Sequence, residues 1–205
     1  MKDQIPDWYK HARPFIDLEK ETRNFKSCGP FMDSFVSGYG IPLPFDLTIK
    51  LVDGEPQFES EVNMIEDRGD SHFEIVQPEG HYPTQYAWKN TVDIQLPEGY
   101  SFLLTHPFNR YDLPFTTMSG IVDADYIIWG GNTPFYLKKG WEGTIKKGTI
   151  IAQILPFKRE EWKSEKHKVF KKTDEEEKDY MEHLTDGQDR RGWYKKWRWV
   201  RKVYE

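Results

Sequence analysis

Short apolar runs bounded by Gly, Pro and Asn recur through the middle of the chain, and several of them alternate with polar residues. In one run Leu47, Ile49 and Leu51 occupy every second position, which is the period of a strand with one buried face. Similar runs predict strands over residues 58–65, 72–77, 92–96, 102–105, 121–122, 127–129, 135–137 and 149–155. Many short strands spaced in this way favour an all-β barrel or sandwich over an alternating βαβ fold.

Two local signals place elements around the first of these runs. Asp53-Gly54 predicts a tight turn, and residues 58–65 are expected to return after it as the hairpin partner. Pro30 suits the first turn of a short helix that carries Phe35 and Val36 on one side and ends at Gly38.

The composition divides the chain into three parts. Residues 1–29 are polar and interrupted by two prolines, and are expected to form an N-terminal arm. Residues 30–157 carry the strand pattern and form the expected β domain. Residues 158–205 are rich in charged side chains and form the expected helical C-terminal extension.

Two helices are predicted in the C-terminal extension. The stretch Thr173-Asp174-Glu175-Glu176 has the form of a capping box, which predicts a helix from there to about Leu184. Further on, four apolar residues are spaced by four, three and four positions and share one face of a terminal helix: Trp193, Trp197, Val200 and Tyr204.

The overall composition limits the class of protein. A chain of 205 residues is long enough to bury a core, and charged residues make up 31% of it. No apolar run approaches the roughly 20 residues that a membrane-spanning helix needs, and residues 1–15 carry no apolar signal-peptide segment. We therefore expect no membrane partner and a cytoplasmic location. Cys28 is the single cysteine, which excludes disulfides and cysteine-based zinc sites within one chain.

The net charge of −5 conceals an asymmetry along the chain. Residues 187–205 contain seven basic and two acidic residues, a balance of +5, so the rest of the chain carries −10. A basic, aromatic tail of this kind can pack on its own or a neighbouring subunit, or can bind nucleic acid through phosphate contacts and stacking. Packing is the interpretation that the sequence favours.

The stretch Gly120-Ile121-Val122-Asp123-Ala124-Asp125-Tyr126, followed by Lys147-Gly148-Thr149-Ile150-Ile151-Ala152-Gln153, resembles the core of the dUTPase and dCTP-deaminase family. The resemblance covers roughly residues 96–155. It implies the β-clip fold of that family and a homotrimer whose sites lie between subunits. It also implies that the first stretch is a β-hairpin lying beside the strand that ends near residue 155.

The same resemblance implies roles for individual residues. Asp123 would be the general base that activates water, and Tyr126 would pack against the sugar and base. Gln153 would lie by the phosphates. His106 and Arg110 stand near the place of the family's phosphate-binding motif, but that motif reads Pro-Arg-Ser-Gly, whereas this chain reads Thr105-His106-Pro107-Phe108-Asn109-Arg110. The glycine-rich C-terminal arm of the family is also replaced by bulky residues.

Each candidate residue also has a structural interpretation. Asp123 and Asp125 could fix a tight turn by accepting bonds from backbone amides. Tyr126 could be a core residue, and a buried Gln153 needs a partner, which the hairpin of Asp123 could supply. A metal site at His72, His81, Gln85 and His106 is disfavoured, because their spacing matches no ligand motif.

Two functions follow from these observations. The first is a non-catalytic, trimeric binding or structural module. The combination of a β-clip fold with a short acidic body suggests a bacteriophage protein, in the host cytoplasm or as a head or decoration component of the virion, whose basic aromatic tail meets other viral structural proteins. The second is a divergent pyrophosphohydrolase or deaminase-like enzyme, with Asp123 as general base and Mg²⁺ as the metal of the nucleotide. The binding module requires no cofactor.

Overall fold

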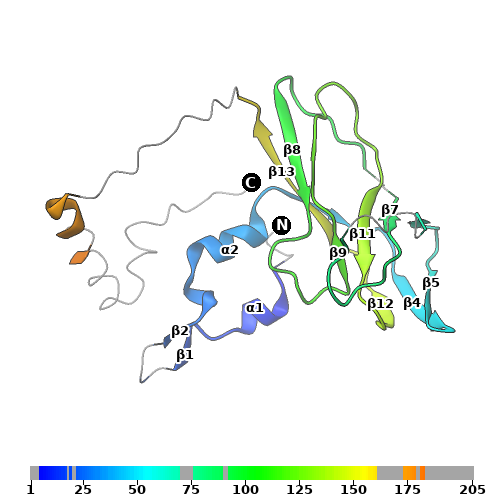
Figure 1. Cartoon of the computed structure of the whole chain (residues 1–205), viewed down its shortest axis with the longest axis horizontal. Coiled ribbons are helices and arrows are strands. Elements are labelled where there is room, and N and C mark those ends of the chain that lie inside the picture. The colour runs from blue at the N-terminus through cyan, green and yellow to red at the C-terminus, as the bar shows by residue number, and fades with distance from the viewer. Residues whose placement is uncertain are drawn as a thin grey trace. The chain divides into compact units, whose positions relative to one another are not determined.

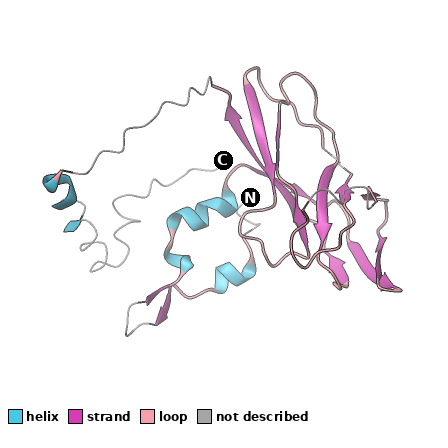
Figure 2. Cartoon of the chain, viewed as in Figure 1, coloured by secondary structure: helices cyan, strands magenta, loops and turns pink. Residues whose placement is uncertain are grey.

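The computed structural model describes residues 5–17, 19, 22–69, 76–89, 92–160, 173–178 and 181–182. By their internal contacts, Ser37–Glu160 form one compact unit and Ile5–Val36 belong to a second. Strands dominate the first unit, whereas the second carries the helices α1 and α2 (Figure 2). No helix among these residues is long and apolar enough to cross a membrane.

The described strands of the unit Ser37–Glu160 form three antiparallel sheets, and Figure 1 shows how these strands are arranged. The first has the order β10 (Gly120–Val122), β8 (Tyr100–Thr105), β13 (Ile150–Lys158) and β3 (Tyr39–Pro42). The second has the order β6 (Ile65–Asp67), β7 (Tyr86–Trp88), β11 (Thr133–Leu137) and β9 (Phe115–Thr117). The third has the order β12 (Gly143–Ile145), β4 (Leu47–Val52) and β5 (Glu55–Glu59). The predicted all-β class is confirmed.

Aromatic side chains fill the core of this unit. Trp88, Phe102, Phe115 and Phe135 are fully buried, and the rings of Trp88 and Phe135 stack with their centroids 4.0 Å apart. Alternate residues of β4, Leu47 and Ile49, enter the same core. The period of two in the sequence therefore corresponds to one buried face of a strand, as predicted.

The turn between β4 and β5 fixes the register of this hairpin. Asp53 and Gly54 both have positive φ, 53° and 86°, which is the backbone of a two-residue hairpin turn. Val52 then pairs with Glu55, so β5 starts three residues earlier than the predicted partner at 58–65. That prediction was wrong in its bounds because a two-residue loop leaves no room for a longer connection, and Ile65 belongs to β6 instead.

Two predicted strands do not form as such. Residues 92–96 and 127–129 meet only at one isolated bridge, between Ile94 and Trp129. Ile94 and Leu96 nevertheless pack against the core. The alternation of apolar and polar residues at 92–96 therefore indicates which side chains are buried, but not that the segment pairs with another strand. The predicted strand at 72–77 lies largely outside the described residues.

The expected hairpin over residues 120–126 is also absent. Gly120–Val122 form β10, which pairs with β8, and the chain then turns at residues 124–126. The strand ending near residue 155 is β13, and β8 lies between it and β10. The two stretches that carry the family resemblance thus share a sheet but are not neighbours in it.

The residues Ile5–Val36 are organised by aromatic contacts. They contain α1 (Asp7–His11), a short 3-10 helix η2 (Phe25–Ser27), α2 (Gly29–Val36) and a small sheet of β1 (Phe15–Asp17) and β2 (Thr22–Arg23). The buried Tyr9 packs against Phe31 and Phe35 of α2. The predicted helix at Pro30 is confirmed.

The predicted capping box near the C-terminus is formed. The backbone N–H of Glu176 donates to Thr173 Oγ1 at 3.2 Å, and the N–H of Thr173 donates to the Glu176 carboxylate at 2.8 Å. Residues 174–178 are helical, as are 181–182. The predicted terminal helix with Trp193, Trp197, Val200 and Tyr204 lies outside the described residues.

Candidate functional site

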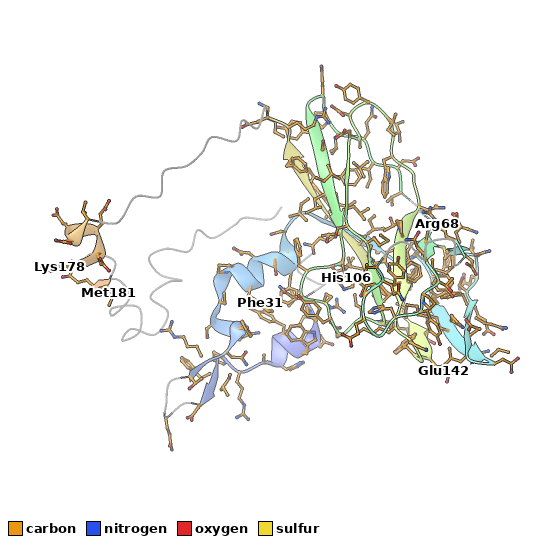
Figure 3. All side chains as sticks on the ribbon, viewed as in Figure 1. Phe31, Arg68, His106, Glu142, Lys178 and Met181 are labelled. Carbon is orange, nitrogen blue, oxygen red and sulfur yellow. The ribbon has the colours of Figure 1, made fainter. Side chains whose placement is uncertain are left out.

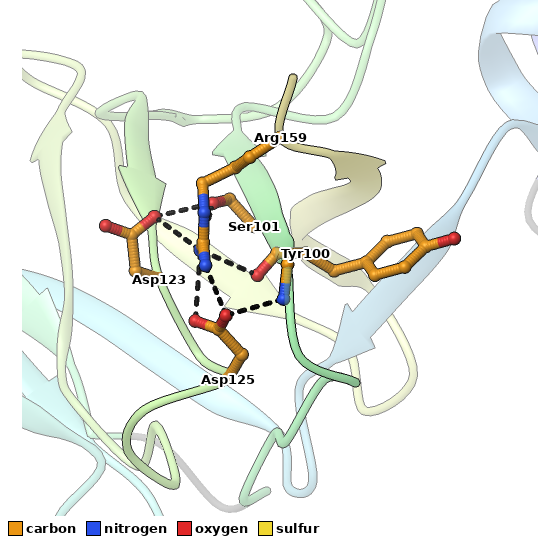
Figure 4. Close-up of polar contacts among 6 residues, drawn as sticks. Tyr100, Ser101, Asp123, Asp125 and Arg159 are labelled. Carbon is orange, nitrogen blue, oxygen red and sulfur yellow. Dashed lines mark hydrogen bonds and ion pairs between the residues drawn. The ribbon is translucent and has the colours of Figure 1, made fainter. Parts of the chain in front are cut away.

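The guanidinium of Arg159 gathers the residues around the predicted general base. Arg159 follows β13 directly, Tyr100 and Ser101 begin β8, and Asp123 and Asp125 belong to the turn after β10 (Figure 4). Because β8 lies between β10 and β13 in the sheet, a side chain at the end of β13 must cross the start of β8 to reach that turn.

Arg159 uses both terminal nitrogens in this contact. Its Nη1 donates to Tyr100 O at 3.0 Å, to Ser101 Oγ at 2.9 Å and to Asp125 Oδ1 at 3.0 Å. Its Nη2 donates to Asp125 Oδ2, which completes a two-pronged ion pair. The carboxylate keeps the guanidinium charged and raises the pKa of Arg159.

Asp125 is the buried member of the pair of aspartates. Its side chain is 1% exposed, and its Oδ2 also accepts the backbone N–H of Gly99 at 2.9 Å. The hydrogen bond from Arg159 lowers the pKa of Asp125 to about 2, against the opposing effect of desolvation, and the Gly99 N–H adds to the lowering. Asp125 is therefore ionised at neutral pH. It accepts a backbone amide, as the turn-fixing interpretation expected, but that amide belongs to Gly99 in the turn before β8 rather than to its own turn.

Asp123 is more accessible, but its Oδ1 is already engaged. Its side chain is 59% exposed, and Oδ1 accepts the hydroxyl of Ser101 at 2.5 Å and Nη1 of Arg159 at 3.2 Å. A general base must present a free lone pair within hydrogen-bonding reach of its water. Within one copy of the chain, Oδ1 of Asp123 serves the Arg159 network, so a water would have to meet the carboxylate at Oδ2.

Tyr126 lies on the surface beside this network. The residue is 79% exposed, and the guanidinium carbon of Arg159 lies 5.4 Å from the centroid of its ring, within the range of a cation–π contact. The interpretation of Tyr126 as a core residue was therefore wrong. Ile127 and Ile128 follow it and are also exposed.

Gln153 is buried and bonded at both ends of its amide. Gln153 lies in β13 and is 1% exposed. Its Oε1 accepts the N–H of Phe108 at 2.9 Å, and its Nε2 donates to Ser37 O at 2.6 Å. These partners belong to the loop after β8 and to the residues just before β3, so the expectation that the hairpin of Asp123 would satisfy Gln153 was wrong.

His106 holds the loop that follows β8. Its Nδ1 accepts the N–H of Thr117 at 3.2 Å, so the proton lies on Nε2, which donates to Arg110 O at 3.1 Å. Burial lowers the pKa of His106, which favours this neutral form. Figure 3 shows His106 among the side chains of the β unit.

Arg110 is paired within its own loop. Its Nε and Nη2 each donate to the Asp112 carboxylate at 2.9 Å, a geometry that satisfies the guanidinium fork in the way a phosphate would. The positive charge of Arg110 is thereby matched inside the chain.

The predicted site residues fall into two clusters at opposite ends of the β8–β13 pair. Ser101 pairs with Phe157 beside the Arg159 cluster, whereas Thr105 pairs with Gln153 beside the loop of His106. Gln153 and Arg159 are six positions apart on an extended chain, a span of roughly 20 Å. Within one copy the proposed base and the proposed phosphate contacts are not brought together.

The histidines of the disfavoured metal site are bonded elsewhere. His81 contacts Glu79 O through Nδ1 at 2.9 Å and Thr116 Oγ1 through Nε2 at 2.9 Å. Gln85 directs its Nε2 to the sulfur of Met118. No group of three His, Cys, Asp or Glu residues suited to a metal occurs in the part of the chain that the structure describes, and His72 lies outside that part.

Arg159 and Ser101 are the members of this site that the sequence pattern did not identify. Arg159 lies beyond the last predicted strand, and its position in the sequence assigned it to the charged C-terminal extension. The available signal was the pair Asp123 and Asp125 in an apolar stretch, because buried carboxylates require a cation or N–H donors.

No protein-family model matches this sequence, and no curated protein matches it.

Proposed function

We propose that this chain is a non-catalytic binding or structural module with a β-clip body, that it assembles as a trimer, and that it serves in a bacteriophage particle as a head or decoration component. The observation that carries the proposal is the state of the predicted site residues. Asp123 and Arg110 are paired with other side chains of the same chain, and His106 and Gln153 are bonded to backbone groups. The exposed apolar residues after β10 supply the second support.

The saturation of polar groups argues against nucleotide turnover. A tetra-anionic triphosphate needs cations and N–H donors that converge on its oxygens. In this chain Arg110 is paired with Asp112, Arg159 with Asp125, and the amide of Gln153 with backbone groups. Binding a phosphate would require breaking contacts that are already charge-matched.

The apolar surface near β10 supports association. Ile121, Tyr126, Ile127 and Ile128 are each more than half exposed, and the last three are consecutive. A cluster of large apolar side chains at the surface marks an interaction site. A trimer that covers these residues gives them the burial that a single copy lacks.

The enzymatic alternative is tested with a panel of deoxynucleoside triphosphates and Mg²⁺. We expect no turnover by the wild-type chain. Turnover that Asp123→Asn abolishes, while the exposed control Asp46→Asn retains it, would overturn the proposal and establish Asp123 as the base. Asp46 is a suitable control because its carboxylate pairs with Lys146 on a different sheet.

Association is tested by sedimentation velocity. The mass obtained for a trimer should be about three times the 24.4 kDa of one chain. The double variant Ile127→Ser, Ile128→Ser should shift the population towards the single chain, whereas Val76→Ser, which changes another exposed apolar residue, should not. Mass spectrometry of purified particles tests the viral setting, because a structural component is present in many copies.

A further inference from the structure

A groove separates two strands that belong to different sheets of the β unit. It has a volume of about 650 Å³, within the range of about 300–1,000 Å³ of ligand sites. Its walls come from β5, β6 and the residues between them, with Gln57, Glu59, Asn63 and Asp67 among the polar members.

Both strands that flank this groove end a sheet. β5 is the last strand of the sheet β12-β4-β5, and β6 is the last strand of β6-β7-β11-β9. Each is therefore paired on one side only by the strands that the structure describes. An unpaired strand edge presents backbone N–H and C=O groups that an added chain segment can bond.

The charge of the groove has one sign. Glu59 and Asp67 are the charged residues among its lining side chains, and both are acidic. Lys50 on β4 pairs with Glu59 at 2.7 Å and partly offsets it. Burial raises the pKa of Tyr86 to about 12, the hydroxyl of Thr84 opposes that rise, and the carboxylates of Asp67 and Glu55 add to it.

The floor of the groove is apolar and aromatic. Phe58 and Tyr86 meet edge to face with their centroids 4.9 Å apart, and Leu47, Met64 and Ile65 complete the surface. Leu47, Met64, Ile65 and Tyr86 are at most 7% exposed, so the half-buried Phe58 is the aromatic side chain of the floor that an indole ring or a cation of Arg or Lys can contact.

The chain itself contains a segment with the complementary chemistry. Residues 187–205 carry +5, with Trp193, Trp197 and Trp199 among seven basic residues. The unit Ser37–Glu160 contains seventeen acidic and ten basic residues and carries −7. The segment thus offers indole rings for the apolar floor and cations for the two carboxylates.

We propose that the groove between β5 and β6 receives residues 187–205 of a second copy of this chain. The inference rests on the proposed oligomer. A segment that fits a different surface on its neighbour makes a head-to-tail contact, and such contacts close into rings when the rotation allows. A ring of three copies would fill every groove with one donated segment.

Cross-linking between labelled and unlabelled copies tests the contact directly. A photoreactive amino acid replaces Ser60, which lines the groove, in full-length ¹⁵N-labelled chain mixed with unlabelled chain. We expect cross-links from the labelled groove to unlabelled residues 187–205. Cross-links confined to one copy, or formed only with other segments, would overturn the proposal.

A charge added to the groove tests the recognition. Gln57→Lys places a cation in the lining, and Gln77→Lys makes the same change at an exposed position outside it. At a chain concentration low enough for the single copy to predominate, so that no donated segment occupies the groove, a labelled peptide of residues 187–205 should bind the full-length Gln57→Lys variant roughly five- to tenfold more weakly than wild type, as expected for about 1 kcal/mol of repulsion. The Gln77→Lys control should bind as wild type.

The two proposals fail in different ways. Equal peptide binding by wild type and Gln57→Lys, in a chain that still sediments as a trimer, would overturn the groove contact alone. A chain that remains a single copy at all concentrations would overturn the trimer, and with it the donation of a segment between copies.

Discussion

At the scale of single residues, the site around Arg159 is built from charges that neutralise one another. Asp125 is buried against the guanidinium, and Asp123 reaches the same cation from the surface. A buried carboxylate with this many donors stabilises the fold as long as it stays ionised. The same contacts therefore make a structural role for the two aspartates testable by pH.

Asp125 should make stability depend on acid. Its pKa of about 2 in the folded chain lies below the value of about 3.9 for an unfolded Asp. A carboxylate whose folded pKa is depressed stabilises the fold above the unfolded pKa, and that stabilisation is lost as pH falls from about 4 towards 2. We expect the urea midpoint of wild type to fall in this window, and Asp125→Asn to unfold at lower urea at pH 7 with a smaller change on acidification.

Glu61→Gln provides the control for this comparison, because it removes an exposed carboxylate from another part of the unit. It should keep the wild-type midpoint and pH profile. A profile of Asp125→Asn that parallels wild type between pH 4 and 2 would contradict the assignment.

Gln153 should be important for stability rather than for phosphate binding. Gln153→Leu keeps roughly the volume of the side chain but removes the acceptor of the Phe108 N–H and the donor to the Ser37 carbonyl. Removing one partner of a buried hydrogen bond costs about 1–3 kcal/mol, so we expect a loss of that size in the free energy of unfolding. Chemical denaturation measures it, and the exposed Gln77→Leu should change it by less than about 0.5 kcal/mol.

At the scale of elements, the glycine before β3 allows its backbone to lie very close to that of β13. Gly38 has a φ of +67°, and a Cβ added there would lie 2.0 Å from the carbonyl oxygen of Ile154 in β13. Real Cβ atoms do not approach a backbone oxygen so closely, so the start of β3 or β13 would have to move. Gly54 in the β4–β5 turn has a φ of +86° but open space around it.

These two glycines form a matched pair for mutagenesis. Gly54→Ala meets only the cost of a left-handed backbone, about 1–2 kcal/mol. Gly38→Ala meets the same cost plus a clash, for which overpacking adds about 1–3 kcal/mol. Thermal unfolding should therefore rank Gly38→Ala below Gly54→Ala. Equal melting temperatures would show that β13 yields without cost.

The elements that the sequence predicted correctly are those decided by local chemistry. Three of these depend only on residues close together in the sequence: the alternation of β4, the Asp53-Gly54 turn and the helix at Pro30. The pairing of β10 with β8 and the absence of a strand at 92–96 depend on partners far away in sequence. Arg159 was missed for the same reason, since only the sheet order brings it to Asp125.

At the scale of the whole molecule, charged and apolar surfaces should contribute to association with different dependence on salt. The exposed Ile127 and Ile128 favour contacts that salt does not weaken, because burial of apolar surface is not screened. The contact between residues 187–205 and the acidic groove is electrostatic in part, so salt screens it.

Sedimentation at two salt concentrations should distinguish the two contributions. If both contacts form, raising NaCl from 0.05 M to 0.5 M should weaken peptide binding to the groove, while the apolar double variant Ile127→Ser, Ile128→Ser should dissociate further in high salt than wild type. Association of wild type that disappears entirely in high salt would assign the interface to charge alone.

The position of Arg159 has a mechanical consequence. Arg159 follows β13 directly, one position before the described part of the β unit ends at Glu160, and β13 runs between β8 and β3. Tension applied to the C-terminal extension would load the guanidinium and its two aspartates before it reached the ladder of the sheet. The ion pair thus takes up load that would otherwise act directly on the backbone hydrogen bonds of β13.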